Sequence, residues 1–333
     1  MRKSIFRFFV RLAKLFGEEE VQEVIFPKQE PQQEIEQSPT QEEKKEKQNE
    51  EPPIDVGGVD KKTRKKYYRE LTINSFDPRD IMEVMEVPFL ALSKNRTAPI
   101  NYESPDGSVK VNISRHTNHY LASIYDWDII LFVASKMQEV INSGLDIPPR
   151  TLIVPRHELL KAINKHDANK QQKDLKASLN RLKATLIETT IRNEDGRYDA
   201  GFGFLDSWGY TERKDIKEIK ITLSQWLYDG ICKKGALLKV SKEYFTITSG
   251  LKKFLYRTAR KHVGKNENSW DFSIEKLYEK SGSEREFKKF KHDLKKVVND
   301  NDLPSYFIKW MERDGKDFIR FQNYRGRNAM RRN

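Results

Sequence analysis

The sequence has little cysteine, with only Cys232 in 333 residues. A single cysteine excludes a framework of intramolecular disulfides, and a cytosolic protein is the simplest interpretation. Long apolar runs are also missing. No stretch approaches the roughly 18 apolar residues that a membrane-spanning helix needs, so we expect no integral membrane segment. Hydrophobic residues make up 37% of the chain and aromatic residues 11%. That aromatic share is too high for a wholly disordered chain, so part of it must fold around a core.

Motifs that carry catalytic chemistry are equally scarce. No Gly-x-x-x-x-Gly-Lys-Ser/Thr sequence is present, which removes the common phosphate-binding loop. His116 and His119 have no neighbouring Cys or carboxylate cluster that would complete a metal site. A DNA-nicking enzyme would need a His-hydrophobic-His metal pair, which is absent, and Tyr256 is better interpreted as a packing residue. We therefore expect a binding protein rather than an enzyme, without a metal or a cofactor.

Charge is unevenly distributed along the chain. The sequence holds 62 Lys and Arg against 50 Asp and Glu, a formal net charge of +12. Residues 1–16 carry five basic residues and no acid, and residues 17–60 carry fourteen acids against four lysines. The remainder, 61–333, therefore has a net charge of +17. A body this basic predicts a polyanionic partner, with double-stranded DNA ahead of an anionic membrane surface.

The two ends of the chain are predicted to lie outside the folded body. Residues 1–16 read as a basic amphipathic helix, which could dock into a partner's groove or lie on a membrane, and we favour docking. Its Leu12–Phe16 segment loosely resembles the peptides that grip a sliding clamp, but lacks their leading glutamine. Residues 17–77 read as a disordered acidic linker that ends in a basic run, because they have too little apolar surface to offset ordering. Residues 325–333 form a basic tail.

Periodicity between these ends predicts two similar domains, 78–223 and 224–324. The first has helices over 126–143, 155–164 and from 169. A strand at 187–192, a hairpin turn at 193–196 and a returning strand through Phe202, Phe204 and Trp208 follow, with a further strand at 219–223. The second has helices over 250–263, 273–280 and 283–299, then a hairpin with its turn at 314–315. Asp126 is expected to cap the first helix, and Ser283 with Glu286 to form a capping box. Three helices followed by a hairpin predict an α+β fold of two tandem winged-helix domains.

The third helix of each domain is the candidate recognition helix, since it would bury one face and present the other to the major groove. In the second domain, an apolar face faces away from six candidate DNA-binding residues: Arg285, Lys288, Lys289, His292, Lys295 and Lys296. In the first domain, Leu175, Leu179, Leu182 and Leu186 would be buried. The outward candidates there are Lys170, Lys173, Lys176, Asn180 and Arg181. Asn180 suits adenine and the cations suit phosphates, although an ordinary solvated helix would show a similar pattern.

A further basic stretch lies in the helix over 250–263, which is predicted to pack on one side and to contact DNA phosphates on the other. Its acid-free run is the reason for this interpretation. The candidate residues are Lys252, Lys253, Arg257, Arg260 and Lys261.

Several segments resemble the replication initiator protein A family of plasmids. They are Asp80–Glu83, Pro88–Lys94, Pro99–Tyr102, Ala122–Asp128, Leu179–Thr185, Phe254–His262 and Lys280–Ser283. The resemblance runs from about 78 to 324, and the chain before 78 departs from the family pattern. It implies a bacterial, cytoplasmic replication initiator whose two winged-helix domains bind direct repeats at the plasmid origin. It also implies a monomer or homodimer that promotes origin opening, represses its own promoter and recruits the host initiator, helicase or sliding clamp.

Other classes of nucleic-acid-binding protein fit the residues less well. An RNA-binding protein would expose aromatic residues on a sheet, whereas the aromatic residues here lie at core spacing. A winged-helix transcriptional regulator without a replication role uses the same module and remains the main alternative. Only the family resemblance separates the initiator from the regulator.

Overall fold

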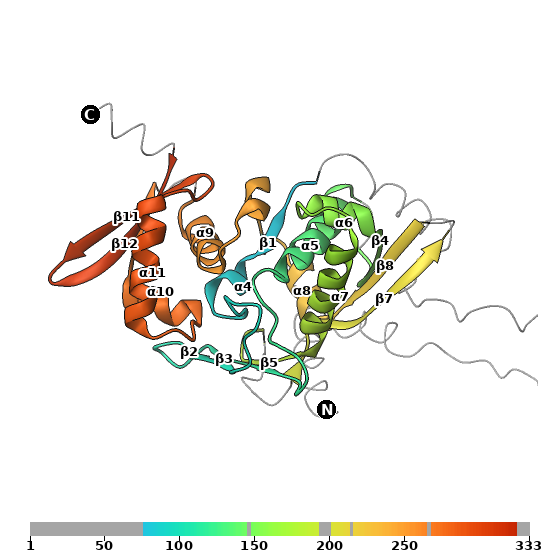
Figure 1. The fold of residues 1–333 in the computed structure, drawn as a ribbon, viewed down its shortest axis with the longest axis horizontal. Coiled ribbons are helices and arrows are strands. Elements are labelled where there is room, and N and C mark those ends of the chain that lie inside the picture. Colours follow the sequence, from blue (N-terminus) through green and yellow to red (C-terminus); the bar gives the residue numbers. More distant parts are fainter. Residues whose placement is uncertain (1–75, 145–147, 193–200, 214–215, 265–267, 325–333) are drawn as a thin grey trace, which may run out of the picture. The chain divides into compact units, whose positions relative to one another are not determined.

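The structure, a computed structural model, describes residues 76–144, 148–192, 201–213, 216–264 and 268–324 (Figure 1). The helix predicted over 1–16, nearly all of the acidic linker, the hairpin turn at 193–196 and the basic tail fall outside these ranges.

The first half of the described chain contains the three predicted helices, α5 (Trp127–Asn142), α6 (Arg156–Ala162) and α7 (Asn169–Ala184). They accompany an antiparallel sheet of β4 (Thr151–Pro155), β7 (Leu205–Arg213) and β8 (Ile216–Leu223), in the order β4-β8-β7 (Figure 1). The helix α5 is buried along most of its length, which explains why its sequence is apolar on nearly every side. The strand β4 was not predicted, because its partner β8 lies far along the chain.

The second half repeats this order of elements. It consists of α9 (Gly250–His262), β10 (Ser269–Ser273), α10 (Ile274–Ser281), α11 (Phe287–Asp300), β11 (Tyr306–Arg313) and β12 (Lys316–Asn323). The strand order β10-β12-β11 is the counterpart of β4-β8-β7, since in each sheet the strand after the first helix pairs with the last strand. Two parts of the chain therefore share one topology, and the fold as a whole mixes α and β elements.

Further elements surround these two parts. A four-stranded sheet has the order β2-β3-β5-β6 and is built from β2 (Ile100–Glu103), β3 (Lys110–Arg115), β5 (Thr185–Thr189) and β6 (Gly201–Phe202). The others are β1 (Arg79–Ile81), α4 (Met82–Glu86), α8 (Gln225–Cys232), β9 (Leu237–Lys239) and the 3-10 helix η2 (Lys242–Thr246). Because β1 pairs with β9, the ladder crosses the predicted boundary at 223/224, and the two domain limits stay a prediction.

Buried ion pairs join α9 to the first half of the chain. Arg257 Nε donates to Asp80 Oδ2 at 2.6 Å, and Trp127 Nε1 donates to Asp80 Oδ1 at 2.8 Å. Lys253 Nζ donates to Asp128 Oδ1 at 2.7 Å. All four charged side chains are buried. Such charges are tolerated in the interior only when each has a partner, so these contacts fix α9 against α5 and β1.

A second connection holds the turn between α10 and α11. Arg96 is buried and donates to the carbonyl of Gly282 in that turn, and also to the carbonyls of Ala98 at 2.9 Å and Pro99 at 2.8 Å. Gly282 has φ +56°, and a Cβ there would lie 2.7 Å from Pro88 Cβ. The turn that precedes α11 is therefore positioned by residues of the first half.

Neither predicted cap forms its side-chain hydrogen bond, although Asp126 does stand at the N-cap position of α5. The carboxylate of Asp126 makes no bond to the amides of α5, because it accepts instead from Arg181, at 2.7 and 2.9 Å, and from the N–H and hydroxyl of Ser123, both at 2.8 Å. In the predicted capping box, Glu286 makes no side-chain cap bond, and Ser283 Oγ accepts from the N–H of Arg285 ahead of the helix. In each case a nearer partner satisfies the polar side chain, so the helix starts without it.

Candidate nucleic-acid interface

The helix α11 separates an apolar face from a basic one. Phe290, Leu294 and Val297 are buried. The six candidates that the sequence singled out are all exposed: Arg285, Lys288, Lys289, His292, Lys295 and Lys296. Arg285 lies just ahead of the helix, and at 100° per residue the six positions fall within an arc of about 120° opposite the apolar residues. We call these six residues the α11 basic face.

Two carboxylates neutralise one edge of this face. Lys289 Nζ lies 3.3 Å from Glu286 Oε2, and Arg285 donates to Asp293 at 2.8 Å. Exposed pairs of this kind contribute only about 0–1 kcal/mol to stability, so phosphate oxygens could replace the carboxylates at little cost. Three side chains of the face have no carboxylate partner within the described ranges: Lys288, His292 and Lys296.

The helix α7 is arranged similarly but carries less charge. Leu175, Leu179 and Leu182 are buried as predicted. The prediction for Leu186 is wrong, because the helix ends at Ala184 and Leu186 lies in β5 with 42% of its surface exposed. The outward residues are three exposed lysines and one half-buried amide: Lys170, Lys173, Lys176 and Asn180.

Arg181 does not belong to this outward set. Its guanidinium forms two hydrogen bonds with the buried carboxylate of Asp126. Burial alone would lower the pKa of Arg181, but the hydrogen bonds and charge of Asp126 raise it above the usual value. Arg181 is therefore a charged residue that positions α7 against the start of α5, and we remove it from the candidate interface.

Most of the basic stretch on α9 is also structural. The prediction that Lys253 and Arg257 contact DNA is wrong for this structure, because both side chains are buried in the ion pairs described above. Lys252 is held by two carboxylates, at 2.9 Å from Asp300 and 2.8 Å from Asp302. Lys261 pairs with Glu86. The acid-free run in the sequence was misleading, since the neutralising acids come from distant parts of the chain.

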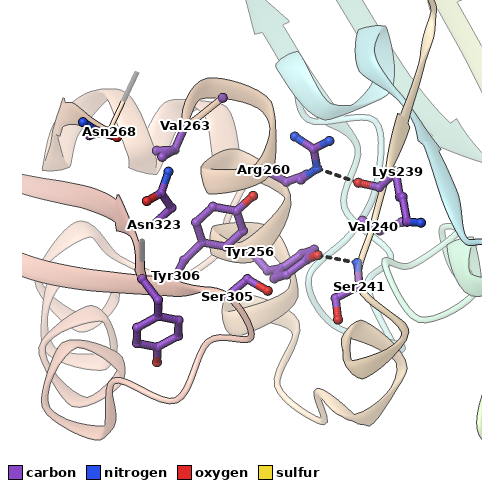
Figure 2. A pocket seen from close by; sticks show the side chains of 12 residues that line it. Lys239, Val240, Ser241, Tyr256, Arg260, Val263, Asn268, Ser305, Tyr306 and Asn323 are labelled. Atoms are coloured by element: carbon purple, nitrogen blue, oxygen red, sulfur yellow. Dashed lines mark hydrogen bonds between the residues drawn. The ribbon is translucent and has the colours of Figure 1, made fainter. Parts of the chain in front are cut away.

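Arg260 lines a cavity of about 760 Å³ instead of facing outward with α11 (Figure 2). Its Nε donates to the carbonyl of Lys239 at 2.5 Å, and the hydroxyl of Tyr256 accepts from the N–H of Ser241 at 2.7 Å. Tyr256 is buried, and burial raises the pKa of its hydroxyl. The described lining contains no residue of α7 or α11, so this cavity is separate from the two basic helix faces.

Sequence reasoning missed the lysines of the hairpin that follows α11. Lys309 and Lys316 are exposed on β11 and β12. Lys295 of the α11 basic face lies 5.0 Å from the ring centroid of Trp310 on β11. Neighbouring residues of a strand point to opposite faces, so Lys309 lies on the other face of the hairpin from Trp310, and Lys316, which pairs with Arg313, shares that face with Lys309. The alternation of exposed Lys309 with buried Ile308 along the strand was the signal that could have located these exposed lysines.

The described part of the chain offers little to other kinds of site. His116 and His119 have ring centroids 6.4 Å apart, and no cluster of three or more His, Cys, Asp or Glu side chains within the described ranges could hold a metal ion. Among the helices described there, none has the length and apolar character needed to cross a bilayer.

Comparison with known proteins identifies the family. Residues 79–308 match the family model described as Replication initiator protein A, which covers well over half of the chain. The chain belongs to the replication initiator protein A family. This confirms the resemblance seen in the sequence, and the match to the initiator family includes α5, α6 and α7 as well as α9, α10 and α11.

One curated relative agrees with this assignment, and one solved structure is similar in fold. A curated protein of Wigglesworthia glossinidia brevipalpis, named "Putative replication protein", is 32% identical over 246 residues, which is 72% of this initiator-family chain and 87% of the relative. Among solved structures, domains 2 and 3 of RctB superpose with a TM-score of 0.51 at 14% identity, covering 73% of this chain and 98% of that one. At this identity the second likeness concerns the fold alone.

Proposed function

We propose that this initiator-family protein starts plasmid replication by binding repeated sites in double-stranded DNA through two winged-helix domains. The repeated topology carries the proposal, because each copy places a helix with exposed lysines next to a hairpin. The helix α11 directly precedes the hairpin of β11 and β12, and α7 lies against β7 of the hairpin of β7 and β8. In helix-turn-helix proteins the corresponding helix lies in the major groove. The likeness to a chain made of two RctB domains supports the two-domain interpretation.

The exposed residues suit a division of labour between phosphate and base contacts. Lysines of α7 and of the α11 basic face would neutralise phosphates, and each such contact lowers the slope of log K against log salt by about 0.9. Asn180 lies on the outward side of α7, where its amide suits the N6 and N7 atoms of adenine. Six phosphate contacts would give a slope of about −5, which a salt titration measures directly.

We further propose that the protein acts without its own enzymatic activity or a cofactor. Several bound copies would supply the binding free energy that opens an adjacent segment of the origin. As a homodimer, the protein would use the same DNA-binding surfaces to repress its own promoter. Copies bound at the origin would recruit the host initiator, helicase or sliding clamp. Support comes from the family assignment and from a sequence without the motif of a nucleotide-hydrolysing site.

Footprinting of the full-length protein on DNA flanking its own gene tests the proposal. We expect protection of several evenly spaced direct repeats. A single inverted repeat over a promoter would instead favour the winged-helix transcriptional regulator, and the absence of any protection would contradict DNA binding at the origin. Loss of plasmid maintenance when the gene is deleted, with the origin left intact, separates the initiator from the regulator.

A further inference from the structure

We propose that the acidic segment over residues 17–60 binds to the α11 basic face of its own chain and competes there with DNA. The docking stands on charge and chain length, and only the competition rests on the proposed function. The segment carries fourteen acids against four lysines. The acidic segment is negatively charged, as the DNA backbone is. A basic surface that attracts DNA therefore also attracts this segment of the same chain.

The α11 basic face is the described surface that fits this segment best. Its six side chains are exposed within one arc of about 120°, and the two carboxylates that pair with its members, Glu286 and Asp293, lie outside that arc. Because the side chains of this face are exposed, an acidic peptide needs no fixed conformation to make several contacts with it.

Several basic residues outside α7 and α11 are less available. Lys252, Lys261 and Arg320 are engaged with carboxylates of the fold. The outward side of α7 offers three exposed lysines, against five Lys or Arg and one His on the α11 basic face. Charge density therefore favours α11 as the docking surface over α7.

The length of the connecting chain permits this contact. The described part begins at residue 76, so fifteen residues, 61–75, separate it from the acidic segment. At 3.3–3.6 Å per residue they reach up to about 50 Å. A folded body of about 250 residues has a radius of gyration of only about 18 Å, so this reach exceeds the diameter of such a body, about 46 Å.

Tethering makes even a weak contact effective. A segment held by a short linker has an effective concentration on the order of 1 mM at its target. If the isolated contact had a dissociation constant of about 0.1 mM, the face would be covered about nine tenths of the time. A DNA duplex would then have to displace the segment, and its apparent affinity would fall about tenfold.

Cross-linking of the full-length protein tests the docking without any DNA. A carbodiimide joins a carboxylate directly to a lysine that it contacts, and peptide mapping identifies the pairs. We expect acids of 17–60 to be joined to Lys288, Lys289, Lys295 or Lys296, with fewer links at about 0.4 M salt, where screening is strong. A mixture of isotope-labelled and unlabelled protein distinguishes links within one chain from links between two chains. Links only to α7, links only between two chains, or no links at all would overturn the proposal.

A charge-neutralised full-length variant tests the competition. Its twelve glutamates in 17–60 become glutamine, with Asp55→Asn and Asp60→Asn, and a matched control changes the same glutamates to aspartate and so keeps the charge. We expect the neutral variant to bind a random-sequence duplex about tenfold more tightly than wild type at about 0.1 M salt, and the control to behave as wild type. Equal affinities for all three proteins would overturn the competition.

A double-mutant cycle, which combines the neutralised segment with substitutions on α11, separates docking from general repulsion between the segment and DNA. In a Lys288→Gln, Lys296→Gln background, docking predicts that neutralising the segment gains less than about threefold in affinity. A gain that stays near tenfold would mean that the segment repels DNA without touching α11, and would overturn the proposal. If no version binds DNA while the cross-links to α11 persist, the docking stands and the proposed DNA-binding function fails.

Discussion

Single residues on α9 show how differently two neighbouring lysines can be used. Lys253 is buried against Asp128, whereas Lys252 lies at the surface beside two exposed carboxylates. We expect Lys253→Met to lower the free energy of unfolding by about 3–5 kcal/mol, because Asp128 would keep a buried charge without a partner. Lys252→Met should cost at most about 1 kcal/mol. Urea denaturation measures both, and equal losses would contradict the difference in burial.

Another single residue, Glu86, should make stability depend on acid. Its carboxylate accepts from Lys280 and Lys261 and lies 3.5 Å from His262 Nε2. Burial alone would raise the pKa of Glu86, but the hydrogen bonds from His262, Lys261 and Lys280 outweigh it and lower the pKa far below the usual range. A carboxylate with a lowered pKa stabilises the fold above its unfolded pKa of about 4.3, and this contribution is lost as the pH falls further.

The thermal midpoint as a function of pH measures this effect. Between about pH 5 and pH 2, the midpoint of wild type should fall more steeply than that of Glu86→Gln, which has no carboxylate to protonate. Parallel curves for the two proteins would show that Glu86 does not contribute to the acid response.

Among the elements, the turn between α10 and α11 should be sensitive to one methyl group. Gly282 and Gly315 both have positive φ, +56° and +68°. Alanine at either position costs about 1 kcal/mol of backbone strain, but at Gly282 it also collides with Pro88 and Ile100, whereas nothing lies within 4 Å at Gly315. We expect Gly282→Ala to destabilise the protein by about 1–3 kcal/mol more than Gly315→Ala. Comparable urea midpoints for the two variants would contradict the close packing of this turn.

The helix α11 as an element is expected to carry part of the salt-dependent affinity. Lys289→Ala combined with Lys296→Ala should weaken DNA binding and reduce the slope of log K against log salt by up to about 2, while the thermal midpoint stays unchanged. Lys234→Ala with Lys242→Ala removes the same charge from exposed positions outside α7 and α11 and serves as the control. Unchanged affinity in the folded α11 variant would remove this helix from the interface.

The elements that sequence reasoning found are those whose pattern is local. Apolar spacing located α5, α7, α9 and α11 to within a few residues, because the residues of one helix face recur every three or four positions along the chain. The strands β4 and β10 escaped, since each is short and pairs with the last strand of its sheet. The partners of Arg257 and Lys253 also escaped, because Asp80 and Asp128 lie 177 and 125 residues away. A basic residue looks the same in sequence whether it faces solvent or a distant buried acid.

For the whole molecule, the buried ion pairs predict that both halves act on DNA as one unit. The contacts of Arg257 with Asp80 and of Lys253 with Asp128 hold α9 against the first half. Insertion of about 5 bp or about 10 bp between the two halves of a protected site should each weaken binding at least about tenfold in gel-shift titrations. Domains on a flexible tether would tolerate the 10-bp insertion, because it restores the phase of the double helix. Tolerance of that insertion would contradict a single unit.

The pairing of β1 with β9 also matters while the protein is being made. Arg79 pairs with Lys239, so the first strand waits for about 160 further residues to leave the ribosome before its partner exists. At about 5–20 residues per second, this delay is roughly 8–30 seconds. A polypeptide released early would lack both the closing strand and the guanidinium that neutralises Asp80. We therefore expect cells to degrade such fragments, so that a half-length DNA binder does not accumulate to block the origin.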